Sequence, residues 1–87
     1  MSSNIYTSKS PHLDLHGETT ATLNYIVKDY INDNYIMGNR FIAIIHGFHS
    51  TILKEEVHKI LKKDKRVLNF YIDFKNIGQT IVELDIK

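Results

Sequence analysis

Two short strings of this chain repeat one pattern, in which an apolar run with strand character ends at a His-Gly pair. The first string is Leu-Asp-Leu-His-Gly at residues 13–17, and the second is Ile-Ile-His-Gly at residues 44–47. A hydroxyl residue and a helix-like pattern follow each pair within a few positions. If the two runs are neighbouring parallel strands, both His-Gly turns lie at one edge of the sheet, where open α/β sheets place their binding crevices. Helix N-termini at that edge favour an anion such as phosphate.

Length and composition indicate one small globular domain. The 87 residues, 43% apolar and 24% charged, suffice for a single core. A formal net charge of +1 excludes a globally basic nucleic-acid binder, so contact with a polyanion requires local clustering of charge. The absence of cysteine fits a reducing compartment, and we expect a cytoplasmic protein. The longest apolar run, residues 41–45, is too short to span a bilayer, so we expect no membrane partner.

Hydrophobic periodicity predicts the element order β-α-β-α-β-β. Residues 1–11 are polar and Ser-rich, which favours a flexible arm ahead of a domain at residues 12–87. We expect strands at residues 12–16, 41–45, 67–74 and 80–86, a turn at residues 75–78, and amphipathic helices in the first two gaps between strands. Candidate helix caps are Thr19 or Thr20, Gly38, and Ser50 or Thr51.

The connections between these elements set the expected fold class. The first crossover should be parallel and right-handed, and the short last connection predicts an antiparallel hairpin. The expected fold is therefore an α/β two-layer sandwich, in which two helices pack on a mixed sheet of about four strands.

These motifs resemble the Smr (small MutS-related) domain family over roughly residues 12–86. The family's Leu-Asp-Leu-His-Gly motif is matched in full by residues 13–17, and its closing Gly-x-Thr-x-Val-x-Leu strand by residues 78–84. His46 and Gly47 match the start of its His-Gly-x-Gly motif, but His49 replaces the second glycine. Lys54 falls where a basic residue is usual, and Phe48 where a small or basic residue is often found.

The resemblance implies nucleic-acid binding, with DNA or RNA as the partner, and endonuclease activity. On that basis we predict a nucleic-acid-binding domain that nicks DNA or RNA at its two His-Gly turns. The alternative is a non-catalytic module that binds nucleic acid or protein through the same edge. His49 is then either a replacement acid or base, or a mark of lost activity, since glycine alone permits close backbone approach there.

Asp14, His16 and His46 are the candidate catalytic residues. Asp14 and His16 share one face of a strand end, and His46 is expected to approach from the neighbouring strand. Imidazole titrates near neutrality, so it can take a proton from water and give one to a leaving oxygen. Asp14 can orient an imidazole or hold a divalent cation such as Mg²⁺, whose requirement stays open. The structural alternative is that Asp14 caps backbone N–H groups and His46 bonds within a tight turn.

Gly17, Gly47, His49 and Lys54 are the candidate phosphate-binding residues. Lys54 lies in the first turn of the second predicted helix, where the dipole disfavours a cation unless an anion lies between them. The alternative is a lone exposed lysine.

Two further sequence features have competing interpretations. The first is a zinc or nickel site, for which the candidate ligands are His12, Asp14, His16, His46 and His49, although no spacing matches a zinc signature. The second is the basic run at residues 62–66, which either compensates the helix dipole or binds phosphates non-specifically. We expect His58 to be a solvated helix residue.

Overall fold

The computed structural model describes residues 10–86 of the chain. The arm predicted at residues 1–11 therefore falls outside the described residues, except for Ser10 and Pro11. Pro11 already pairs with the sheet, because its carbonyl oxygen accepts a hydrogen bond of 2.9 Å from the backbone N–H of Ala43.

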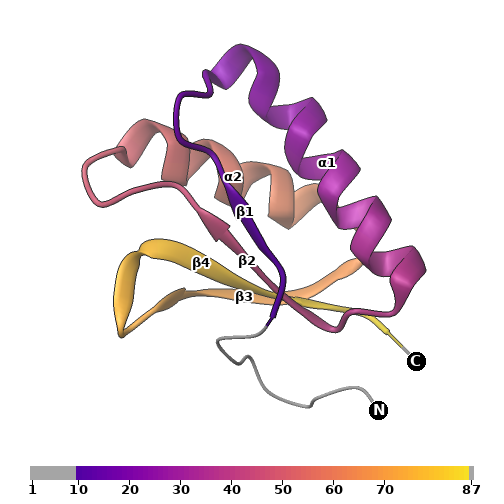
Figure 1. The fold of residues 1–87 in the computed structure, drawn as a ribbon. Coiled ribbons are helices and arrows are strands. Elements are labelled where there is room, and N and C mark those ends of the chain that lie inside the picture. Colours follow the sequence, from indigo (N-terminus) through magenta and orange to yellow (C-terminus); the bar gives the residue numbers. More distant parts are fainter. Residues whose placement is uncertain (1–9, 87) are drawn as a thin grey trace.

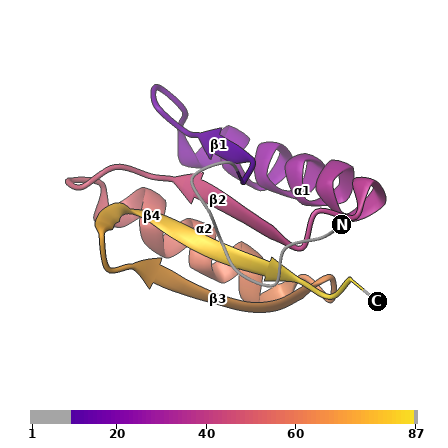
Figure 2. The same ribbon diagram turned by 60° about the horizontal axis from the view of Figure 1, so that its bottom comes forward.

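The elements follow the predicted order. They are β1 (His12–Asp14), α1 (Thr20–Met37), β2 (Phe41–Ile45), α2 (Thr51–Lys63), β3 (Val67–Asp73) and β4 (Asn76–Leu84). The strands form a mixed sheet in the order β1-β2-β4-β3, with β1 parallel to β2 and β4 antiparallel to both its neighbours. Both helices cover one face of this sheet (Figure 1), and the turned view shows the four strands side by side in front of them (Figure 2). The predicted two-layer α/β fold is confirmed.

One apolar core fills the space between the sheet and the helices. The pleat directs alternate residues of each strand toward the helices, so Ile42 and Ile44 of β2 meet the helix stripes while Ala43 is buried on the other face. Burial on both faces explains why residues 41–45 are all apolar. The core cluster comprises Leu15, Leu23, Val27, Ile31, Ile42, Ile44, Val57, Ile60, Leu61, Val82 and Leu84.

The expected residues begin both helices and end α1. Gly38 terminates α1 with a φ of 79°, and its N–H bonds back to the last turn. Ser50 caps α2, because its side chain accepts a hydrogen bond of 3.3 Å from the N–H of Leu53. Thr19 is the N-cap of α1 by position, but its side chain makes no capping bond.

The strand ends differ from the prediction. The strand β1 stops at Asp14, since residues 16 and 17 already form a turn. The turn predicted at residues 75–78 shortens to residues 74–75, and β4 starts at Asn76. The side chain of Asp73 accepts from the N–H of Lys75, and that of Asn76 accepts from the N–H of Gly78. These local bonds close a tight hairpin and free the following residues for pairing.

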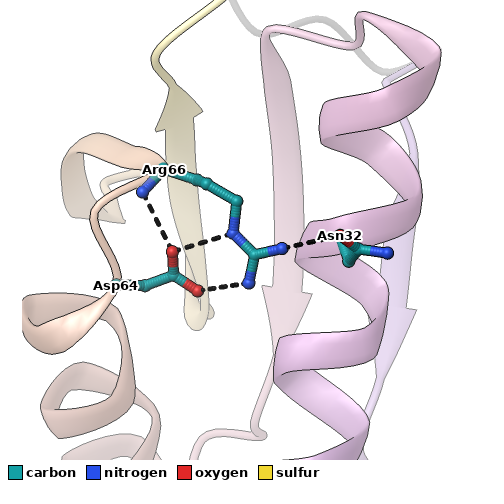
Figure 3. A network of polar contacts seen from close by, with 3 residues as sticks. All are labelled: Asn32, Asp64 and Arg66. Atoms are coloured by element: carbon teal, nitrogen blue, oxygen red, sulfur yellow. Dashed lines mark hydrogen bonds and ion pairs between the residues drawn. The ribbon is translucent and has the colours of Figure 1, made fainter.

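At the end of the strands opposite to the β3–β4 hairpin, Arg66 joins the end of α2 to α1 (Figure 3). Its guanidinium donates to both carboxylate oxygens of Asp64, at 3.0 and 2.8 Å, and to the side-chain oxygen of Asn32 at 2.9 Å. Arg66 is therefore a structural link between the helices. Lys62 and Lys63 occupy the last turn of α2, where the dipole favours cations.

Candidate functional site

Two turns, at residues 16–17 and 46–50, and the first residues of β4, 76–78, meet at the end of the sheet where β1 and β2 finish. We call this end the His-Gly edge. The parallel pairing of β1 and β2 brings the first two together, and the N–H of Leu15 donates to the carbonyl of Ile45 at 2.9 Å. The start of β4 joins them because the carbonyl of Gly78 accepts from the N–H groups of both His46 and Gly47, each at 2.9 Å. The sequence prediction that both His-Gly turns share one edge is confirmed.

Glycine is favoured in the two turns by backbone conformation, and at Gly78 the available space is tight. Gly17 and Gly47 have φ of 81° and 90°, values that strain any L side chain. A Cβ added at Gly78 would lie 3.2 Å from the side-chain oxygen of Asn76 and 3.4 Å from the backbone of both Gly47 and Phe48. Gly17 and Gly47 therefore permit the bend of the backbone in the two turns, and Gly78 lets β4 approach the second turn closely.

His46 is almost fully buried, with 4% of its surface exposed. Its Nδ1 lies 3.1 Å from the carbonyl oxygen of Gly47, and its Nε2 lies 3.0 Å from the hydroxyl of Thr80. The same hydroxyl lies 2.8 Å from Nε2 of His58, on α2. One threonine hydroxyl thus bridges two imidazoles that come from β2 and α2.

The chemistry of these groups fixes the proton positions. The Gly47 carbonyl can only accept, so neutral His46 carries its proton on Nδ1 and its Nε2 accepts from the Thr80 hydroxyl. The Thr80 oxygen then accepts from Nε2–H of His58. This tautomer assignment follows from the hydrogen-bond network. It leaves Nδ1 of His58 without a proton, as the acceptor at the end of this series of hydrogen bonds.

Burial keeps both imidazoles neutral. Desolvation lowers the pKa of His46 below 6.5, opposed by its bond to Gly47 and assisted by the charge of Lys54. Desolvation also lowers the pKa of His58, followed by the charges of His46, Lys54 and Lys62. The neutral forms that the hydrogen-bond chain requires therefore predominate near neutral pH.

His58 is a site residue that sequence reasoning missed, and the expectation that it is solvated is wrong. It is half-buried, and its ring lies 5.0 Å from that of Phe70. One signal was available in the sequence: His58 follows Lys54 by four residues and so shares its face of α2. The inward-facing Thr80, which supplies the bridge, becomes apparent only from the pairing of β2 with β4.

Asp14 and His16 lie at the same edge but not beside the ring of His46. Both are exposed, and the carboxylate of Asp14 accepts a hydrogen bond of 2.9 Å from the N–H of His16. Asp14 is paired with Ile45, so the pleat places it on the face of the sheet turned away from the helices. The ring of His46 instead meets Thr80 and His58 on the helix side.

The histidine-rich metal site has no counterpart in the part of the chain that the structure describes. Within residues 10–86, no three His, Asp or Glu side chains gather in a way that would hold a metal ion. Asp14 accepts a hydrogen bond from a backbone N–H of its own turn, which is the structural alternative given above. His46 is hydrogen-bonded to the Gly47 carbonyl and to Thr80.

A cavity of about 270 Å³ opens at the start of α2, and we call it the Lys54 cavity. Its walls come from the second turn of the edge, from α2, from β3 and from β4: they are Gly47, Phe48, Ser50, Thr51, Lys54, Ile72 and Ile77. A shallower hollow of about 550 Å³ adjoins it at residues 47–52 and includes His49. Gly47, His49 and Lys54 therefore gather here, whereas Gly17 lies in the neighbouring turn.

The electrostatics of this cavity favour an anion. Lys54 is half-buried in the first turn of α2, and that turn contains no acidic residue. The positive end of the helix dipole and the ammonium group of Lys54 therefore both act on the Lys54 cavity. Among the described residues that line the cavity or the adjoining hollow, none is Asp or Glu.

Comparison with known proteins identifies the family. A model of the Smr domain matches residues 13–85, which is most of the chain. The chain belongs to the Smr domain family.

Similar proteins include bacterial MutS2 proteins and two solved Smr structures. The chain is 30% identical over 79 residues to an "Endonuclease MutS2" of Halothermothrix orenii and 37% identical over 75 residues to one of Geobacillus sp.. These matches cover 90% and 83% of this chain but only 10% of each relative. The chain thus corresponds to about a tenth of the length of these relatives.

The structural matches reproduce the whole two-layer fold. The Smr domain of Thermus thermophilus MutS2 superposes with a TM-score of 0.81 at 26% identity, covering 85% of this chain and 96% of that one. YdaL, a stand-alone small MutS-related protein from Escherichia coli, also gives 0.81, at 21% identity, covering 93% of this chain and 68% of YdaL. In addition, no helix within residues 10–86 is long and apolar enough to cross a membrane.

Proposed function

We propose that this domain binds DNA or RNA at the His-Gly edge and holds one backbone phosphate in the Lys54 cavity. The proposal fits the family, whose relatives are named as MutS2 endonucleases. The phosphate would meet the ammonium of Lys54 and the positive end of α2. The turn at Gly47 gives it close access to backbone.

One observation supports this proposal most strongly: Lys54 is a half-buried cation in the first turn of α2, where the helix dipole disfavours positive charge. Lys54 adds positive charge to a helix start that has no acidic residue in its first turn, and no described residue of the cavity wall carries a carboxylate. Such an arrangement costs free energy in the unbound domain, and a bound phosphate removes that cost. At the opposite edge, Arg66 is already paired with Asp64, so it offers no comparable site.

The test is fluorescence anisotropy with labelled single-stranded RNA, duplex DNA and branched DNA at several salt concentrations. Substitution Lys54→Ala should weaken binding to every substrate on which the wild type is measurable and lower the salt slope by about 1, as expected for the loss of one phosphate contact. Lys65→Ala, an exposed lysine at the opposite edge, is the matched control. Equal affinity and salt slope in wild type and Lys54→Ala would overturn the proposed site.

The second candidate function is phosphodiester cleavage at the same edge. We propose it because His16 is exposed beside the exposed Asp14, in the turn next to the one that lines the Lys54 cavity. In addition, the relatives are named endonucleases. In this mechanism the His16 imidazole exchanges protons with water and the leaving oxygen, and Asp14 fixes the His16 backbone. His46, buried and bonded at both nitrogens, acts by holding the second turn in place.

Nicking of supercoiled plasmid, with Mg²⁺ or with EDTA, decides between cleavage and simple binding. We expect wild type and Lys65→Ala to nick alike and His16→Ala to lose nicking while it keeps its nucleic-acid affinity. The comparison of Mg²⁺ with EDTA shows whether a divalent cation takes part. Equal nicking by wild type and His16→Ala would contradict the role of His16. Binding without any turnover by wild type would establish the alternative, a non-catalytic recognition module.

A further inference from the structure

The rim of the Lys54 cavity has apolar side chains that the fold leaves uncovered. Phe48, in the loop between β2 and α2, has 65% of its surface exposed, and Ile77 of β4 has 58% exposed. Phe48 lines both the cavity and the adjoining hollow, and Ile77 lines the cavity itself. Exposed apolar side chains that converge on one opening from different elements indicate a binding surface rather than chance exposure.

Phe48 and Lys54 line the same cavity, and together they offer a group for each of the two parts of a nucleotide. A flat aromatic side chain and an ammonium group line one cavity, and a nucleotide offers a flat base and a phosphate joined by one sugar. Bases that are not paired stack on aromatic side chains in this way, whereas bases inside a duplex present only their edges. The aromatic side chain at position 48 can therefore distinguish unpaired from paired bases, which the phosphate site alone cannot do.

We propose that Phe48 is a stacking platform for an unpaired base whose phosphate lies against Lys54, so that the domain prefers single-stranded nucleic acid to a continuous duplex. This inference rests on the proposed function, since the phosphate position comes from it. The charge of the site selects this occupant over an apolar protein segment. An apolar segment would cover Phe48 and Ile77 but would leave the Lys54 ammonium without an anion, as no carboxylate lines either hollow among the described residues.

The chain also provides a matched control for Phe48. Phe74 is another exposed aromatic side chain, 96% exposed in the neighbouring turn, but it lines neither the cavity nor the hollow. Both phenylalanines are mostly solvent-exposed, so their replacement by alanine should leave the fold intact. Any difference between the two variants therefore reports on the cavity and not on general apolar exposure.

The experiment measures the affinity of wild type, Phe48→Ala, Phe74→Ala and Lys54→Ala for three probes of equal length. The probes are single-stranded oligothymidylate, an oligomer of abasic deoxyribose phosphates and a blunt DNA duplex. Wild type should bind oligothymidylate best. Phe48→Ala should weaken that binding by about 5- to 100-fold, the usual cost of one lost base stack, to the level of the abasic oligomer. Phe74→Ala should match wild type, and Lys54→Ala should weaken binding of all three probes.

The outcomes separate this inference from the function on which it rests. If Phe48→Ala binds oligothymidylate as wild type does while Lys54→Ala loses affinity, the stacking platform is wrong and the phosphate site stands. A wild-type preference for the duplex, or an equal loss in Phe74→Ala, also overturns the platform. If wild type binds none of the probes, the platform is overturned, and the phosphate site falls with it if single-stranded RNA and branched DNA do not bind either.

Discussion

At the scale of single residues, the hydroxyl of Thr80 is the polar centre of the site. It lies within hydrogen-bond distance of one imidazole from β2 and another from α2, and it is itself fully buried. A series of hydrogen bonds runs from His58 through Thr80 and His46 to the carbonyl of Gly47. Because buried polar groups are costly when unpaired, each member depends on the others.

Replacement of Thr80 by valine tests this dependence, since valine keeps the shape of threonine and removes only the hydroxyl. Thr80→Val leaves both imidazoles without their shared partner, so we expect a loss of about 1–3 kcal/mol in the free energy of unfolding. Urea denaturation measures it. Thr22→Val is the control: Thr22 lies on the exposed surface of α1, and its replacement should change stability by less than about 0.5 kcal/mol. Equal effects of the two substitutions would contradict the account.

The lowered pKa values of His46 and His58 predict a dependence of stability on pH. Because the folded state holds both imidazoles with pKa values below the ordinary 6.5, the unfolded chain binds more protons as the pH falls past that value. The stabilisation is thus fully present above pH 6.5 and declines as the pH drops toward the folded-state pKa values. Urea unfolding measured from about pH 8 to pH 5 should show this decline.

A variant identifies the groups responsible for that decline. In His58→Leu, the fall of stability with decreasing pH should be shallower than in wild type, because one of the two titrating groups is gone. The same slope in both proteins would show that the buried imidazoles do not control it.

Prediction from sequence reached some of these residues and missed others for physical reasons. Gly17, Gly47 and His46 stand at the ends of apolar runs, and a local pattern is enough to find them. The pairing of Thr80 with Ile44 and the contact of Thr80 with His58 join segments far apart in the chain, so no local pattern reveals them. For the same reason, His46 could be placed at the edge but not assigned to the helix side of the sheet.

At the scale of the elements, α2 has different chemistry at its two ends. Its N-terminal turn contains Lys54 and opens on the cavity, whereas its C-terminus is fixed to α1 through Arg66. The carboxylate of Asp64 is nearly buried, with 6% of its side chain exposed, and it is held by the Arg66 guanidinium at 2.8 Å. The hydrogen bond from Arg66 is the main cause that lowers the pKa of Asp64.

Arg66→Ala should destabilise the domain, because it leaves the Asp64 carboxylate without its partner and removes the bond to Asn32. We expect a loss of about 1–3 kcal/mol in the free energy of unfolding near neutral pH. The depressed pKa of Asp64 stabilises the fold above the ordinary aspartate value of 3.8, and this contribution is lost as the pH falls further. The deficit of the variant should therefore shrink in acid. Lys65→Ala, at an exposed neighbour, should be close to neutral.

The element boundaries show what sequence patterns resolve. Periodicity and caps located α1 and α2 well, because Gly38 and Ser50 act locally. The hairpin was misplaced because Asn76 and Gly78 are typical turn residues, yet the structure uses both inside β4. Contact of the Gly78 carbonyl with the second His-Gly turn, a tertiary interaction, overrides the local preference.

At the scale of the whole molecule, the two edges of the sheet do different work. The edge with Arg66 joins helix to helix, and the His-Gly edge joins two turns and the start of β4 beside a cavity that favours an anion. A two-layer sandwich leaves these turns uncovered by the helices, which pack on one face of the sheet (Figure 1). The helix-to-helix link and the cavity proposed to bind phosphate thus lie at opposite ends of the strands.

Backbone amide chemical shifts during titration with nucleic acid test the central claim most directly. An unlabelled single-stranded oligonucleotide added to the ¹⁵N-labelled domain should shift the amides of Gly17, of residues 47–51 and of Gly78. Amides of residues 62–66, at the opposite edge, should stay unchanged and serve as the internal control. Shifts confined to residues 62–66, or no shifts at saturating oligonucleotide, would contradict binding at the His-Gly edge.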